Sequence, residues 1–205
     1  MTVTPTKEST TRWVVLHGAP PFTVDDLLTF PDDGNRYELF DGNRYELFDG
    51  SLLVSPPPMP MHQRAILRLA RLLEDAAPPG FQPLHAVNLR AGPRDFFIPD
   101  LVVVSVEALD RTELMFAPDD ILLAVEMVGP STQMRDRHTK RAAYAAAGIP
   151  TYWRIELSEG PSLYVHELAG EEYKPAEKYE AGEVATLLTP FETSFDPAVL
   201  IRPRA

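Results

Sequence analysis

Apolar residues recur along the chain with two different periods, and the change of period marks the expected elements. Over 61–77 they recur every three or four positions, which predicts an amphipathic helix ending before a Pro-Pro-Gly sequence. The runs 101–104 and 121–128 are apolar on both faces, which is typical of strands in the centre of a sheet. A second long helix is predicted over 131–147, because Gly148 and a proline follow it.

Shorter elements are predicted between these. Thr23 to Asp26 resembles a capping box and predicts a short helix there. The remaining strand candidates are 83–89, 96–104, 151–156 and a series of short strands joined by turns over 162–200. The pattern therefore predicts an α/β fold, with a β-sheet core flanked by α-helices and followed by a C-terminal β-meander.

An identical octapeptide, GNRYELFD, occurs twice in tandem, at 34–41 and at 42–49. Each copy is rich in strand formers and ends in Asp-Gly, which favours a type I′ hairpin turn. The second copy predicts a hairpin of 44–48 with 51–54. Because the repeat length is even, the first copy could add a strand in phase or bulge out as a loop. We expect the second copy to lie next to the core, since its downstream spacing is uninterrupted.

Composition limits the class of protein. The chain has 205 residues, of which 44% are hydrophobic and 24% charged, which suits one folded domain at 23–205 after a flexible polar tail at 1–22. No apolar run is long enough to cross a membrane or to form a signal peptide, and cysteine is absent. These features fit a cytoplasmic protein without disulfides. The net charge of -11 counts against a mainly non-specific nucleic-acid binder, although a local basic groove is compatible with it.

Two acidic residues stand at positions where burial would be costly. Asp100 follows Pro99 at the start of the run 101–104, and Glu126 lies inside the run 121–128. An unpaired carboxylate there would cost several kcal/mol, so each needs a partner or an opening onto a cleft. Two such carboxylates on adjacent strands form an oxygen site suited to Mg²⁺ or Mn²⁺. The alternative is that each caps a strand or pairs with a nearby arginine.

Lys140 lies on the helix that follows the Glu126 strand. Asp136, Lys140 and Tyr144 share one helix face, which a strand-to-helix unit returns toward the end of the strand that carries Glu126. The alternative is an ordinary surface pair of Asp136 with Lys140. Lys140 also belongs to a basic cluster with Arg135, Arg137 and Arg141, which is where nucleic acid would approach.

Other candidate residues have simpler explanations. His62 opens the helix 61–77, where it could contact a phosphate, although a surface capping role is the more common one. His85, His138 and His166 show no metal-ligand spacing. Tyr152-Trp153 is most simply explained as strand packing, with stacking on DNA as the alternative.

Four segments together resemble a known family. They are RYELFDG (44–50), IPDLVVV (98–104), AVEMVGPST (124–132) and DRHTKRAAYAAAGIPTYW (136–153). Their order and spacing resemble the Uma-type restriction endonuclease family, which belongs to the PD-(D/E)XK nuclease superfamily. The resemblance extends from about Phe22 to Leu200 and implies a restriction endonuclease-like mixed sheet.

The resemblance also implies roles for individual residues. Asp100 matches the acidic residue of the Pro-Asp motif, and Glu126 matches the acidic residue of the (D/E)XK motif. The lysine expected two positions later is Val128 here, so the resemblance makes Lys140 its replacement. Glu46, or its copy Glu38, matches the acidic residue that often completes the site, and we favour Glu46.

The expected function is that of a Mg²⁺- or Mn²⁺-dependent endonuclease that hydrolyses phosphodiester bonds, of DNA rather than RNA. Asp100 and Glu126 would hold the metal, and Glu46 and Lys140 would complete the catalytic set. A homodimer would suit the cutting of both strands of a duplex. Two alternatives remain open at this point: a non-catalytic module that keeps the nuclease fold for binding or dimerisation, and an unrelated metal-dependent hydrolase.

Overall fold

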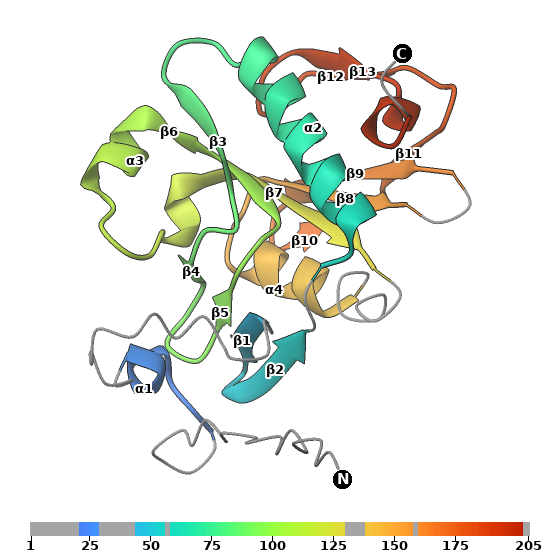
Figure 1. Ribbon diagram of the computed structural model, residues 1–205. Helices are drawn as coiled ribbons and strands as arrows, with labels where there is room; N and C mark the ends of the chain where they lie inside the picture. The colour runs from blue at the N-terminus through green and yellow to red at the C-terminus, as the bar shows by residue number, and fades with distance from the viewer. Residues whose placement is uncertain (1–20, 29–43, 56–57, 130–137, 158–159, 203–205) are drawn as a thin grey trace, which may run out of the picture.

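The computed structural model describes residues 21–28, 44–55, 58–129, 138–157 and 160–202 (Figure 1). Almost all of the predicted tail, the first octapeptide copy and the first part of the predicted helix 131–147 lie outside the described residues. None of the helices in the described part of the chain has the length and apolar character to cross a bilayer.

A seven-stranded mixed sheet forms the centre of the molecule. Its strands run in the order β10-β9-β8-β7-β6-β3, with β11 paired to β9. β7 and β8 are parallel, and the other neighbouring pairs are antiparallel. The strands are β3 (Phe81–His85), β6 (Leu101–Ser105), β7 (Ile121–Val128), β8 (Thr151–Glu156), β9 (Ser162–Ala169), β10 (Glu172–Tyr173) and β11 (Glu177–Glu180). The predicted mixed sheet is therefore confirmed.

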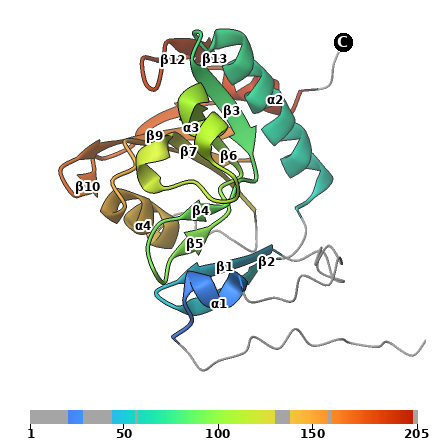
Figure 2. The ribbon, with the colours of Figure 1, turned by 90° about the vertical axis from the view of Figure 1, so that its left-hand side faces the viewer.

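A smaller sheet of four strands lies beside it, in the order β2-β1-β5-β4. These strands are β1 (Arg44–Phe48), β2 (Ser51–Ser55), β4 (Leu89–Arg90) and β5 (Phe96–Phe97). Asp49 and Gly50 have φ angles of 44° and 74°, as a type I′ turn requires, and they join β1 to β2 as predicted. Figure 2 shows this hairpin and α1 (Val24–Leu28) together beneath β4 and β5. α1 begins with the predicted capping box, in which the amide of Asp26 donates to Thr23 Oγ1 over 3.2 Å.

Two predicted strands are each divided in the structure. The candidate 83–89 becomes β3 and β4, because Ala86 has a φ of 52° and cannot continue the strand. The candidate 96–104 becomes β5 and β6, with Pro99 between them. Proline has no N–H to donate to a sheet, so the pairing is interrupted there.

The helices cover both faces of the central sheet. α2 (Pro60–Ala76) confirms the predicted amphipathic helix, whereas only Lys140–Ala146 of the predicted 131–147 helix is described as α-helix, namely α4. α3 (Val106–Arg111) was not expected, because six residues are too few to show a helical period. The remaining elements are the 3₁₀ turns η1 (Pro118–Asp120) and η3 (Pro197–Leu200) and the hairpin of β12 (Ala185–Leu187) with β13 (Thr193–Phe195).

The sheet separates two apolar clusters. Leu123, Val125 and Met127 of β7 face the first cluster, which α2, β12 and β13 cover. Ala124, between them, faces the second cluster, which contains Tyr144 of α4. Because side chains alternate along a strand, Glu126 points to the same face as Ala124, toward α4.

Candidate active site

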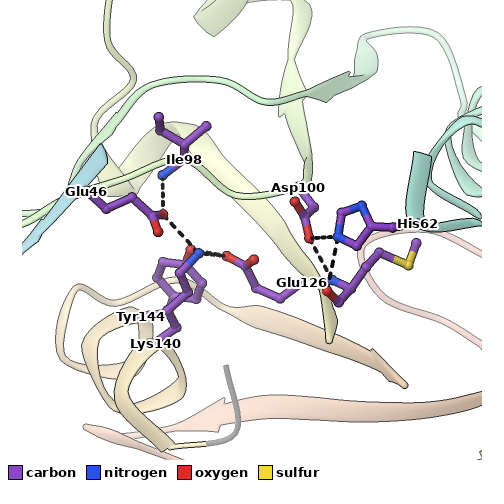
Figure 3. A network of polar contacts seen from close by, with 8 residues as sticks. Glu46, His62, Ile98, Asp100, Glu126, Lys140 and Tyr144 are labelled. Carbon is purple, nitrogen blue, oxygen red and sulfur yellow. Dashed lines mark hydrogen bonds and ion pairs between the residues drawn. The ribbon is translucent and has the colours of Figure 1, made fainter. Parts of the chain in front are cut away.

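Glu126 is buried near the carboxyl end of β7, on the face that α4 covers. Nζ of Lys140 lies 2.8 Å from Glu126 Oε1, and the hydroxyl of Tyr144 donates to the same oxygen over 2.6 Å (Figure 3). Lys140 and Tyr144 are four residues apart on α4, a spacing that places both side chains on one helix face. The predicted return of α4 toward the end of β7 is therefore present.

Glu46 of β1 completes the environment of Lys140. Its Oε1 lies 2.9 Å from Lys140 Nζ and accepts a hydrogen bond from the amide of Ile98 over 2.8 Å. The Lys140 ammonium thus lies between two buried carboxylates that come from different sheets. The second octapeptide copy supplies this group, and the alternative residue Glu38 lies outside the described residues.

Asp100 lies beside Glu126 across the β6–β7 pairing. The register pairs Leu101 with Val125, so its continuation by one position sets Asp100 opposite Glu126. Asp100 Oδ2 accepts a hydrogen bond from the amide of Met127 over 2.8 Å. Directly opposite residues project from the same face of a sheet, and Figure 3 shows the contacts of Glu126 with Lys140 next to those of Asp100 with His62.

His62, at the start of α2, contacts Asp100, which the sequence analysis did not predict. Its Nε2 lies 3.1 Å from Asp100 Oδ2 and 3.1 Å from the carbonyl oxygen of Met127. Because both neighbours are acceptors, Nε2 carries the proton. The surface-capping interpretation of His62 is wrong: its side chain is 13% exposed, and α2 has no side-chain cap. No spacing rule could have found it, since 38 residues separate it from Asp100.

Two expectations about Lys140 are corrected. A surface pair of Lys140 with Asp136 is excluded by burial, because only 3% of the Lys140 side chain is exposed. The same burial removes Lys140 from the expected basic surface cluster. Of the other members, Arg141 is exposed, and Arg135 and Arg137 lie outside the described residues.

The site is strongly desolvated. Burial raises the pKa of Tyr144 well above its ordinary value, and the nearby carboxylates of Glu126 and Glu46 raise it further. Tyr144 therefore stays protonated and remains a donor to Glu126. Removing one partner from a buried ion pair of this kind costs about 3–5 kcal/mol, because the other charge is left without compensation.

The carboxylates of Glu126 and Asp100 have different hydrogen-bond and ion-pair partners. Within the described ranges, His, Asp and Glu side chains form no group of three or more that could hold a metal ion. Glu126 is bound to Lys140 and Tyr144, whereas Asp100 is bound to His62 and the Met127 amide.

The aromatic and remaining histidine candidates belong to the interior or the surface of the fold. Tyr152 and Trp153 are fully buried on opposite faces of β8, which confirms the packing interpretation. His166 stacks on Tyr152, with ring centroids 5.6 Å apart. His85 is exposed at the end of β3, and His138 is exposed just before α4.

Comparisons with known proteins identify the family and the fold. The sequence profile of the Uma2 family, described as "Putative restriction endonuclease", matches residues 24–199. A crystal structure of a DUF820 "putative nuclease" from Anabaena variabilis superimposes with a TM-score of 0.64 at 17% sequence identity. The superposition covers 83% of this chain and 90% of that one, which shows a shared fold. No curated protein matches. Because the family profile spans most of the described chain and includes Glu46, Asp100, Glu126 and Lys140, the chain belongs to the Uma2 family.

Proposed function

We propose that this protein is a divalent-metal-dependent endonuclease that hydrolyses phosphodiester bonds of DNA. The observation that carries the proposal is the contact of buried Lys140 with both Glu46 and Glu126, beside Asp100 on the neighbouring strand. In the described part of the chain four acidic side chains are buried, and three of them converge here. A fold that only needed stability would gain little from such a cluster, since apolar residues of similar volume serve as well or better.

The chemistry of the two carboxylates supports a Mg²⁺ or Mn²⁺ ion in this proposal. Mg²⁺ typically takes one or two carboxylates and keeps several waters, so Asp100 and Glu126 suffice as side-chain ligands. The carbonyl oxygen of Met127 and Oδ2 of Asp100 both contact His62 Nε2, each over 3.1 Å. A bound divalent ion would supply Lewis-acid polarisation of a phosphoryl oxygen and activation of water.

The chain's own residues provide positioning and charge. The Lys140 ammonium would neutralise negative charge that develops on the attacked phosphate, in an interior where such a contact is strong. Glu46 and the Tyr144 hydroxyl hold Lys140 and Glu126 in place before substrate arrives. His62 fixes the orientation of Asp100, as partners of ligating carboxylates commonly do.

The test is cleavage of supercoiled plasmid and of duplex oligonucleotides with Mg²⁺, with Mn²⁺ and with chelator. We expect metal-dependent cleavage that is lost in Asp100→Asn and in Lys140→Ala. Asp120→Asn is the matched control, because Asp120 is also buried but pairs with Arg111 away from the site. Equal cleavage in chelator, or no cleavage of any substrate by the wild type, would contradict the proposal. Parallel RNA substrates test the preference for DNA.

The closed network also suggests a second candidate, a non-catalytic module that keeps the fold for binding. The supporting observation is that Glu126 already has two donors within the protein, Lys140 and Tyr144. Calorimetric titration with Mg²⁺ distinguishes the candidates. The endonuclease binds the ion and loses that signal in Glu126→Gln, whereas the module gives no signal in either protein.

We further propose that the endonuclease acts as a homodimer, because two sites related by a two-fold axis suit the antiparallel strands of a duplex. Sedimentation equilibrium of the full chain measures the oligomeric state directly. A monomer at all concentrations would contradict this part of the proposal without affecting the assignment of the site.

A further inference from the structure

The sheet face that carries Glu126 continues into a row of polar residues beyond the site. The register pairs Glu126 with Arg154, Arg154 with Tyr164, and Tyr164 with Lys178. Directly opposite residues project from the same face, so the four side chains form one row across β7, β8, β9 and β11. With about 4.8 Å between neighbouring strands, the row is about 14 Å long.

This row leads from the interior to the surface. Tyr152, two residues before Arg154 on the same face of β8, is fully buried in the second apolar cluster. Beyond it, the exposed fraction of the side chain rises from 2% for Glu126 to 12% for Arg154 and 44% for Lys178. The inner end of the row therefore lies beside the buried carboxylates, and its outer end lies at the surface.

Tyr164 holds two cations close together. The guanidinium carbon of Arg154 lies 4.0 Å from the centroid of the Tyr164 ring, and Lys178 Nζ lies 5.8 Å from it. Each cation also forms an ion pair with the glutamate two residues later on its own strand. Arg154 pairs with Glu156, and Lys178 pairs with Glu180. A guanidinium has five N–H donors, and in the described structure the ion pair of Arg154 uses only Nη1. The ion pair with Glu156 therefore uses only part of the hydrogen-bonding capacity of the Arg154 guanidinium.

Arginine charges act on the same face of the sheet. Burial is the main reason that the pKa of His166 falls to about 4, and the charges of Arg141 and Arg154 lower it further. Arg141 and Arg154 thus both act on this face, where the charges of Arg154 and Lys178 are balanced by Glu156 and Glu180 as long as no phosphate is bound.

We propose that Arg154, Tyr164 and Lys178 form a strip that binds the phosphate backbone of nucleic acid and leads it to the Lys140 site. The inference rests on the proposed nuclease function and adds to it the surface that receives the substrate. Arg and Lys neutralise phosphates without regard to base sequence. A guanidinium can also donate two parallel hydrogen bonds to one phosphate. Tyr164 keeps the two cations at a fixed spacing, and incoming phosphates compete with Glu156 and Glu180 for them.

The test is binding of a fluorescently labelled duplex by the full chain in chelator, measured by anisotropy over a series of salt concentrations. Each phosphate contact that is lost lowers the slope of log K against log salt by about 0.9 for duplex DNA. We expect this change for Arg154→Gln and for Lys178→Gln, and about twice the change for the double variant. Affinity should fall by a similar factor for duplexes of unrelated sequence, because the strip reads no bases.

Two matched controls are available in the chain. Arg111 and Lys174 are also cations paired with carboxylates, those of Asp120 and Glu167, but neither belongs to the row. Arg111→Gln and Lys174→Gln should leave the slope unchanged.

The possible results distinguish a failure of the proposed binding strip from a failure of the proposed nuclease function. If the wild type binds and cleaves but the strip variants have the slope of the controls, the strip is wrong and the nuclease assignment remains. If the wild type neither binds nor cleaves any nucleic acid, both fail together. If Arg154→Gln does not fold, Lys178→Gln decides alone, because Lys178 is exposed and a purely structural role there would not change a salt slope.

Discussion

The Lys140 ammonium lies 2.8 Å from Glu126 Oε1 in the interior, although 14 positions separate the two residues. The contact follows from the parallel pairing of β7 with β8. Parallel strands need a crossover connection, and α4 lies in the connection between these two strands, against the face that carries Glu126. Position 128, two after Glu126, is a buried valine. A helix side chain therefore reaches the carboxylate from a different element than the superfamily pattern expects.

The octapeptide provides its own control for the role of Glu46. Glu46→Gln removes a charge that faces Lys140 over 2.9 Å, so we expect it to lower the free energy of unfolding by about 1–3 kcal/mol and to reduce cleavage. Glu38→Gln makes the same change in the other copy, and we expect an effect within about 0.5 kcal/mol. Urea unfolding and plasmid cleavage measure both. A larger effect from Glu38→Gln would assign the site to the first copy.

His62→Ala should weaken metal binding while leaving the fold intact. The Nε2 proton of His62 holds Asp100, and loss of a partner that orients a metal ligand typically reduces metal affinity or activity by about 10- to 100-fold. Calorimetric titration with Mn²⁺ checks this. His85→Ala, at an exposed histidine, is the control and should bind the ion as the wild type does. Equal affinities in the two variants would show that His62 only packs against the sheet.

Tyr144→Phe removes one donor to Glu126 without changing the shape of the side chain. Hydrogen bonds to charged groups contribute about 1.5–3 kcal/mol, so we expect a loss of that order in urea unfolding. Tyr179→Phe is the matched control, because its hydroxyl donates to Glu177 at an exposed position. An equal, small loss in both variants would mean that Lys140 alone satisfies Glu126.

Acid should destabilise the fold through His166. Its pKa in the folded protein is about 4, mainly because of burial, and lies below the ordinary value of 6.5. The unfolded chain therefore binds the proton more readily, and stability falls as the pH drops from 6.5 toward 4, by up to about 3 kcal/mol. His166→Phe keeps a ring against Tyr152 but cannot titrate, so its stability should vary less over this window. Parallel pH profiles of the two proteins would exclude His166 as the cause.

Local sequence determined the elements whose causes are local. The Asp49-Gly50 turn needs only residues that tolerate positive φ, and α2 needs only a period of apolar residues ended by Pro-Pro-Gly. The continuous apolar run of β7 was sufficient to mark Glu126 as an unusual acidic residue among apolar neighbours. These features depend on interactions within a few positions, which a single sequence contains.

Tertiary structure decided the rest, because the contacts join residues that are distant in the chain. Lys140 was ordinary by spacing alone, and only the packing of α4 against β7 and β1 makes it a buried cation between two carboxylates. His62 reaches Asp100 only because the start of α2 meets the end of β7. The row of Arg154, Tyr164 and Lys178 exists only in the strand register, which depends on pairing across the sheet. Burial and register are properties of the assembled sheet, so no local pattern could have specified them.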